Sequence, residues 1–151
     1  MSSDLFDLTG KYALVTGGAQ GLGRMIAEGL LRAGATVVIT SRKTDICEAA
    51  ASDMAPLGKC IALPADLSTP EAAVDLAQRY RDTVGDALHI LVNNAGKTWG
   101  GTIDTFPDKA WPSVMMVNVQ TPFTLVRELL SELTAAGTPD DPARVINIGS
   151  I

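Results

Sequence analysis

The sequence of 151 residues lacks most of the features that mark membrane, secreted and metal-binding proteins. It has no apolar run near the roughly 20 residues that a membrane-spanning helix needs. Its first residues lack the basic start and apolar centre of a secretory signal. Its two cysteines, Cys47 and Cys60, form no CxxC pair and have no histidine nearby. We therefore expect a cytoplasmic protein with no membrane partner, no disulfide and no metal site.

Positive charge and repetitive sequence are also scarce. The net charge of −5 argues against a general affinity for nucleic acid, and no repeat or low-complexity tract is present. The charge is uneven: residues 1–43 hold five basic and three acidic residues, a net +2, so the remainder carries −7. Apolar residues make up 46% of the chain, which is enough for one core. The composition predicts one domain over residues 1–151.

The clearest local pattern is a strand, a glycine-rich turn, a helix and a second strand. Residues 12–15 are apolar and prone to form a strand, and residues 36–40 are rich in β-branched side chains. Apolar residues at helical spacing indicate the helix between them, namely Leu22, Ile26, Leu30 and Ala33. Together these segments predict a βαβ unit.

The turn at residues 16–23 is built from small residues where the chain must pass sharply from strand to helix. A helix N-terminus has unpaired N–H groups and a partial positive charge, so it stabilises an anion such as a pyrophosphate. The residues that we assign to a dinucleotide here are Gly17, Gly21, Leu22 and Gly23. The alternative is a tight strand-to-helix turn that binds nothing.

The rest of the chain repeats the alternation of strand and helix. The further elements that we expect are a helix from Thr44 to about Met54, a strand at 59–63, a helix from Ser68–Glu71 to Gly85, a strand at 89–92, a long helix at about 108–136 and a strand at 144–148. Strands that alternate with helices favour an α/β fold with right-handed crossovers. We predict a Rossmann-like, doubly wound parallel sheet with strand order 3-2-1-4-5.

The end of the second strand indicates which dinucleotide is bound. An acid there would bind a ribose 2′-hydroxyl, whereas a basic residue would bind a 2′-phosphate. The sequence has Ser41, Arg42 and Lys43 at this point and no carboxylate. Because a guanidinium can grip a phosphate with paired hydrogen bonds, Ser41 and Arg42 favour NADP over NAD. The alternative is that Arg42 and Lys43 are solvated surface charges.

The long helix contains a proline that should distort it. Pro122 lies four residues after Asn118 and has no N–H to give to the Asn118 carbonyl. We therefore expect a kink that leaves this carbonyl free. The alternative is a surface asparagine in a helix that bends only for packing.

Four motifs in this order resemble the short-chain dehydrogenase/reductase family, in the form seen in β-ketoacyl reductases. They are Thr16-Gly-x-x-x-Gly-x-Gly23, Asn93-Asn-Ala-Gly96, Asn118 and Asn147-Ile-Gly-Ser150. The segments 97–100 and 143–150 resemble bacterial reductases of the rhamnolipid-pathway β-ketoacyl type. The likeness covers essentially the whole chain.

The resemblance implies how the remaining cofactor contacts are made. Asp66 and Leu67 would meet the adenine, and Ala95 with Gly96 would lie against the adenosine ribose. Asn93 would brace the sheet. NADP(H) would carry a hydride to or from a small carbonyl or alcohol substrate, with a 3-oxoacyl compound as one candidate.

The resemblance also implies the catalytic roles. Ser150 would hydrogen-bond the substrate carbonyl and stabilise its growing charge. The main-chain carbonyl of Asn118 would hold a water that links to a catalytic lysine. Residues 97–99 would line one wall of the substrate pocket. The family commonly forms dimers or tetramers, with the long helix in the interface.

The family's proton donor, a tyrosine in Tyr-x-x-x-Lys after the catalytic serine, is missing. The only tyrosines are Tyr12 and Tyr80, and neither has a lysine four residues on. We therefore expect this chain to be an incomplete fragment of a longer reductase, without the C-terminal catalytic and substrate-binding part, and to be inactive alone. One alternative is a non-catalytic NADP(H)-binding module. Another, a glycine-loop methyltransferase, is disfavoured by Arg42, because such enzymes usually place an acid there.

Overall fold

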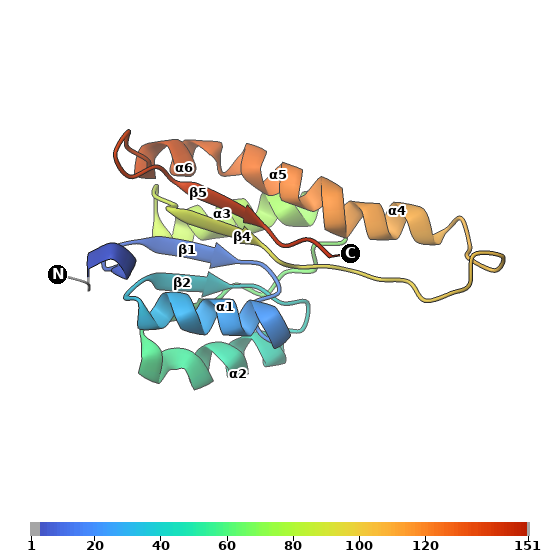
Figure 1. Cartoon of the computed structure of the whole chain (residues 1–151), viewed down its shortest axis with the longest axis horizontal. Coiled ribbons are helices and arrows are strands. Elements are labelled where there is room, and N and C mark those ends of the chain that lie inside the picture. The colour runs from blue at the N-terminus through green and yellow to red at the C-terminus, as the bar shows by residue number, and fades with distance from the viewer. Residues whose placement is uncertain (1–3, 151) are drawn as a thin grey trace.

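A computed structural model describes residues 4–150 as a five-stranded parallel sheet with helices on both faces (Figure 1). The elements are η1 (Asp4–Phe6), β1 (Tyr12–Val15), α1 (Gly21–Arg32), β2 (Thr36–Ile39), α2 (Thr44–Met54), η2 (Ala55–Leu57), β3 (Cys60–Ala62), α3 (Pro70–Val84), β4 (Ile90–Asn93), α4 (Ala110–Met115), the π-helical turn η3 (Met116–Gln120), α5 (Thr121–Glu128), α6 (Leu130–Ala136) and β5 (Arg144–Asn147). The strand order is β3-β2-β1-β4-β5, which confirms the predicted α/β fold.

The register of the sheet brings all five carboxyl ends to one edge. Every neighbouring pair of strands is parallel. Val15, near the end of β1, lies opposite Ile39 of β2 and Val92 of β4. The turns that follow β1, β2 and β4 therefore meet at the same edge, where open α/β sheets bind their ligands.

Successive strand residues point to opposite faces of the sheet and build two apolar layers. On one face, α1 and α2 cover Ala13, Val37 and Ile39. On the other face, α3, α5 and α6 cover Leu14 and Val38 (Figure 1). These strand residues are fully buried on both faces, as expected of a parallel sheet with two helical layers.

Helix α1 packs through a face that is shifted by one position from the predicted one. Its buried residues are Gly23, Ala27 and Leu31, whereas Leu22 is 53% exposed. The small side chains of Gly23 and Ala27 let the helix approach the sheet closely, so the centre of the buried stripe lies one position after the predicted one. The predicted helix is correct, and Ile26 and Leu30 pack against the core as expected, whereas the prediction for Leu22 is wrong.

The single long helix predicted at 108–136 is wrong, because the structure divides it into three parts. The chain leaves α4 through η3, in which the Thr121 N–H reaches the Met116 carbonyl five residues back. A second break lies at Leu129, with φ −103° and ψ 15°, between α5 and α6. Pro122 explains the first break, because it cannot donate to Asn118. The kink that we expected near Asn118 is thus confirmed as a π-helical turn.

Strand β5 lies at the open edge of the sheet, as the predicted strand order implies. All four of its residues are exposed, including Val145 and Ile146, whose side chains point to opposite faces.

Both cysteines are free thiols, and burial raises the pKa of Cys60 to about 11. Among residues 4–150, no group of His, Cys, Asp or Glu side chains could hold a metal ion, and no helix has the length and apolarity of a membrane span.

Candidate cofactor and active site

The glycine turn after β1 has the backbone geometry that only glycine adopts easily. Gly17 and Gly21 have φ of +65° and +54°. Gly23 is required for a different reason, because a Cβ there would lie 2.2 Å from the Gly17 carbonyl oxygen. The N-cap of α1, Gln20, makes no side-chain hydrogen bond to the first turn. The first N–H groups of this helix therefore have no cap and can receive an anion.

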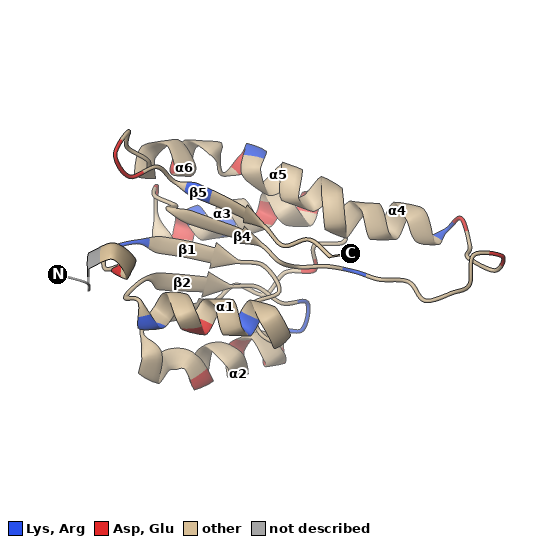
Figure 2. Cartoon of the chain, in the orientation of Figure 1, with Lys and Arg blue, Asp and Glu red and all other residues tan. Residues whose placement is uncertain are grey.

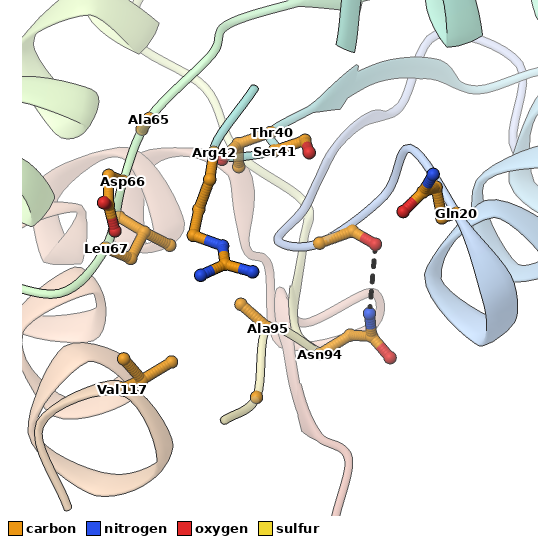
Figure 3. A pocket seen from close by; sticks show the side chains of 12 residues that line it. Gln20, Thr40, Ser41, Arg42, Ala65, Asp66, Leu67, Asn94, Ala95 and Val117 are labelled. Atoms are coloured by element: carbon orange, nitrogen blue, oxygen red, sulfur yellow. Dashed lines mark hydrogen bonds between the residues drawn. The ribbon is translucent and has the colours of Figure 1, made fainter. Parts of the chain in front are cut away.

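Thr16 and Asn94 fix this turn to the end of β4. The Thr16 hydroxyl oxygen accepts hydrogen bonds from the backbone N–H of Asn94 (3.0 Å) and of Ala95 (2.9 Å). The Asn94 side-chain amide donates to the carbonyls of Thr16 (3.0 Å) and Gly17 (3.3 Å; Figure 3). The two residues hold the turn after β1 and the segment after β4 in one arrangement. We predicted no role for either residue from the sequence, although both lie within the family motifs.

A cavity of about 260 Å³ lies between these turns at the carboxyl edge of the sheet (Figure 3). Its lining residues are Gly17, Gln20, Thr40, Ser41, Arg42, Ala65, Asp66, Leu67, Asn94, Ala95, Gly96 and Val117. Seven of them were predicted to bind the cofactor, namely Gly17, Ser41, Arg42, Asp66, Leu67, Ala95 and Gly96. Gly21, Leu22 and Gly23 do not line it, because they form the start of α1 beside it.

The Arg42 side chain extends into this cavity between Leu67 and Ala95 (Figure 3). No ion pair of Arg42 occurs within residues 4–150. The Thr40 hydroxyl, which also lines the cavity, is buried and finds no hydrogen-bond partner in that part of the chain. An unpaired cation, an unpaired hydroxyl and an uncapped helix suit a ligand with phosphate groups.

A second pocket of about 820 Å³ adjoins the first and shares Asn94, Ala95 and Gly96 with it. It contains the other three predicted residues, Asn93, Asn118 and Ser150. Lys97 and Thr98 line it as expected, whereas Trp99 is not among its lining residues.

Two asparagines order the walls of this second pocket. The Asn118 side chain accepts a hydrogen bond from the Lys97 N–H (2.8 Å) and donates to the Lys97 carbonyl (2.9 Å). The Asn93 amide donates to Asn147 Oδ1 (2.8 Å) and so links β4 to β5. Asn118 therefore positions the segment after β4, and Asn93 ties β4 to β5, the strand that leads to Ser150.

The two tyrosines lie away from both pockets. Tyr80 is fully buried, donates to the Ala87 carbonyl (2.8 Å) and has a pKa raised by burial. Tyr12 stacks on His89 at the opposite, amino edge of the sheet. Neither hydroxyl can donate a proton at the site.

The family follows from comparison with known proteins. A model of the short chain dehydrogenase family matches residues 11–151. The chain belongs to the short-chain dehydrogenase family. The resemblance that the four motifs predicted is therefore confirmed.

Among the similar proteins of this family are 3-oxoacyl-[acyl-carrier-protein] reductases. The rhamnolipid-biosynthesis reductase of Pseudomonas aeruginosa is 45% identical over 146 residues, which cover 97% of this chain and 57% of that protein. FabG of Haemophilus influenzae is 33% identical over 144 residues, with 95% and 57% covered. These similarities confirm the expected likeness to β-ketoacyl reductases. The chain spans little more than half the length of these relatives.

Solved structures of the family agree closely with this fold. The RhlG/NADP active-site complex of Pseudomonas aeruginosa superposes with a TM-score of 0.92 at 46% identity, covering 96% of this chain and 56% of that one. The 3-oxoacyl-(acyl-carrier-protein) reductase of Agrobacterium tumefaciens C58, solved with NADP bound, gives a TM-score of 0.88 at 29% identity, with 100% and 57% covered.

Proposed function

We propose that this chain is the NADP(H)-binding part of an oxidoreductase that transfers a hydride between NADP(H) and a small carbonyl or alcohol substrate. The observation that carries the proposal is the first cavity, which has the uncapped start of α1 on one side and the unpaired Arg42 on the other. The bound NADP in two similar structures supports it.

The lining residues fit the parts of this dinucleotide. The first turn of α1, from Gly21 to Gly23, would hold the pyrophosphate. Arg42 with Ser41 would hold the 2′-phosphate, because a guanidinium offers paired donors to phosphate oxygens. Asp66 and Leu67 would meet the adenine, and Ala95 and Gly96 the ribose. When bound, the cofactor would donate or accept the hydride, and these residues would orient it.

Titration calorimetry with NADPH and NADH tests the cofactor assignment. We expect NADPH to bind more tightly, and Arg42→Gln to weaken NADPH binding by about tenfold to a hundredfold, in line with the loss of a charged hydrogen-bond pair. NADH binding should change little. Lys43→Gln is the matched control, because Lys43 is the next residue but does not line the cavity. Equal losses for NADPH and NADH would contradict the assignment.

Ser150 and Asn118 are the proposed catalytic residues on this chain. Ser150 would hydrogen-bond the substrate oxygen in the second pocket. The Asn118 carbonyl, which Pro122 cannot bond, would hold a water of the proton path. The proton donor would come from a downstream segment, since neither tyrosine here reaches the site. We thus propose that the chain is the first part of a longer reductase and is inactive by itself.

The coding sequence after codon 151 provides the direct test. We expect it to continue into a Tyr-x-x-x-Lys segment, and we expect the longer protein to oxidise NADPH with ketones, including 3-oxoacyl thioesters. Ser150→Ala in that protein should lower kcat by about a hundredfold or more with little effect on NADPH affinity. If the gene stops at Ile151 and the folded chain still binds NADPH, the alternative of a non-catalytic NADP(H)-binding module holds instead.

We further propose that the protein forms a homodimer or homotetramer through η3 and its flanking helices. Large apolar side chains are exposed here about one helical turn apart, namely Trp111, Met115, Val119 and Phe123. Phe123→Glu should shift the mass measured by light scattering toward the monomer, whereas Val74→Glu on α3 should not. A monomeric wild type would contradict the proposed oligomer.

The cytoplasmic location stays a prediction that cell fractionation can check.

A further inference from the structure

A third pocket, of about 420 Å³, opens between the first two and has a distinct charge. It shares Arg42 and Asp66 with the first cavity, and Lys97 and Thr98 with the second. Its charged lining residues are two cations and one acid, which leaves a net +1 at neutral pH. Figure 2 shows basic residues on both of the segments that contribute them, after β2 and after β4. The Ser68 hydroxyl completes its polar lining.

Neither cation of this pocket forms an ion pair with the protein. Within residues 4–150, no carboxylate lies within ion-pair distance of Arg42 or Lys97. By contrast, Arg24, Arg32 and Arg81 are each paired with a glutamate. Two unpaired cations that line one small pocket repel each other weakly and attract an anion between them.

Lys97 is held in place by contacts that leave part of its ammonium free. Its backbone N–H and carbonyl are both bonded to the Asn118 side chain. Its ammonium donates to the Ser113 hydroxyl on α4. An ammonium has three donors, so one protein acceptor leaves two for a ligand. This lysine is therefore oriented before any ligand arrives, which lowers the entropy cost of binding.

We propose that Lys97 and Arg42 hold a phosphate group in this third pocket, with the hydroxyls of Ser68 and Thr98 as further donors. The inference goes beyond the proposed function, which uses Arg42 alone and gives Lys97 no ligand. Two sources offer this chemistry: the 2′-phosphate of the cofactor, and a phosphate ester on the substrate. Both sources carry a phosphate monoester, which has nearly two negative charges at neutral pH.

The test is a titration of the 151-residue chain with inorganic phosphate, followed by NMR chemical shifts at constant ionic strength. We expect saturable shifts at residues of the third pocket, and we expect Lys97→Met to weaken phosphate binding by about tenfold. Lys109→Met is the matched control, because Lys109 also lacks an acidic partner among residues 4–150 but contacts Trp99 and does not line the pocket. Lys97→Arg should retain binding, and circular dichroism checks that each variant is folded.

Competition with nucleotides then distinguishes the two sources. If NADPH displaces the phosphate and NADH does not, the subsite takes the 2′-phosphate. If both nucleotides bind and leave the phosphate in place, it takes a separate ester. Displacement by NADH, or phosphate binding that Lys97→Met leaves unchanged, would place the anion at the start of α1 and overturn the proposal. If phosphate binds as expected but neither nucleotide binds, the proposed function fails and the subsite stands.

Discussion

At the scale of single residues, the site depends on two groups that particular residues lack: the Cβ that glycine lacks and the N–H that proline lacks. Gly23 leaves room for the Gly17 carbonyl and the Asn94 amide, and Pro122 has no N–H to give to the Asn118 carbonyl. Thr16 and Asn94 then supply the hydrogen bonds that hold the turn. The sequence indicated the glycines because few residues can replace them. It did not single out Thr16 or Asn94, because a polar residue in a turn has many possible partners.

Gly23 should be the least tolerant glycine of α1. A Cβ at this position would lie 2.2 Å from the Gly17 carbonyl oxygen and 2.4 Å from Asn94 Nδ2. We expect Gly23→Ala to lower the free energy of unfolding by about 1–3 kcal/mol and to weaken NADPH binding at least tenfold. Urea unfolding and calorimetry measure these two effects.

Gly29 on the same helix provides the control. A Cβ there meets no atom within 4 Å, and its φ is not positive. Gly29→Ala should raise the free energy of unfolding by about 0.5–1 kcal/mol. If the two variants behaved alike, close approach of α1 to the turn would not be the reason for Gly23.

At the scale of elements, the π-helical turn η3 couples the helix to the segment after β4. Pro122→Ala would give the Asn118 carbonyl a donor and favour a regular α-helix through this region. Asn118 would then rotate and lose its two bonds to Lys97. We expect the Lys97 amide to exchange with deuterium at least tenfold faster in this variant. Pro112→Ala should not change this rate, because Pro112 lies in the first turn of α4, where an N–H is not needed.

The amino ends of β1 and β4 contain a pH-sensitive contact. His89 Nδ1 accepts a hydrogen bond from the Tyr12 N–H (3.1 Å), and burial, together with the nearby Lys11 ammonium, lowers the pKa of His89. The unfolded chain, with a His pKa of about 6.5, therefore takes up the proton first as the pH falls. The contribution of His89 to stability is present above that pH and is lost as the pH falls through the folded pKa.

Urea unfolding between about pH 7.5 and 5 measures this effect, since unperturbed carboxylates titrate mostly below that range. The free energy of unfolding should fall toward the acid end for the wild type. His89→Gln, which does not titrate, should show a shallower slope. Because His89 is the only histidine of the chain, an unchanged slope would rule out this contact as the cause.

At the scale of the whole molecule, the fold was more predictable than its details. The order β3-β2-β1-β4-β5 follows from strands that alternate with helices and from the hand of the crossovers. The division of the long helix was not foreseen in full, because the break at Leu129 has no proline or glycine to signal it. The cavities could not be predicted, since their volumes depend on how side chains from five segments pack.

The exposed strand β5 should govern the solution behaviour of this chain. Both faces of the strand are partly exposed, with Ile146 at 43%, and its outer edge has no neighbouring strand among residues 4–150. We expect the chain to aggregate on warming, and Ile146→Thr to raise the temperature at which light scattering increases. Val74→Thr on α3 is the control, with a similar exposure of 41% but a helical setting. An equal gain from both variants would mean that general surface polarity, not the strand, sets the aggregation temperature.

The parallel arrangement of the strands separates stability from recognition. The sheet and its helices provide most of the core, and the loops at the carboxyl edge line the pockets. Most of the ladder bonds and of both apolar layers lie below the carboxyl edge, although Ala19 and Leu67 of the edge loops also pack into the core. A new specificity can then arise by exchanging short surface segments such as the one around Lys97, while the frame beneath keeps its shape. For protein engineers, this edge is the natural place to graft recognition for a different ligand.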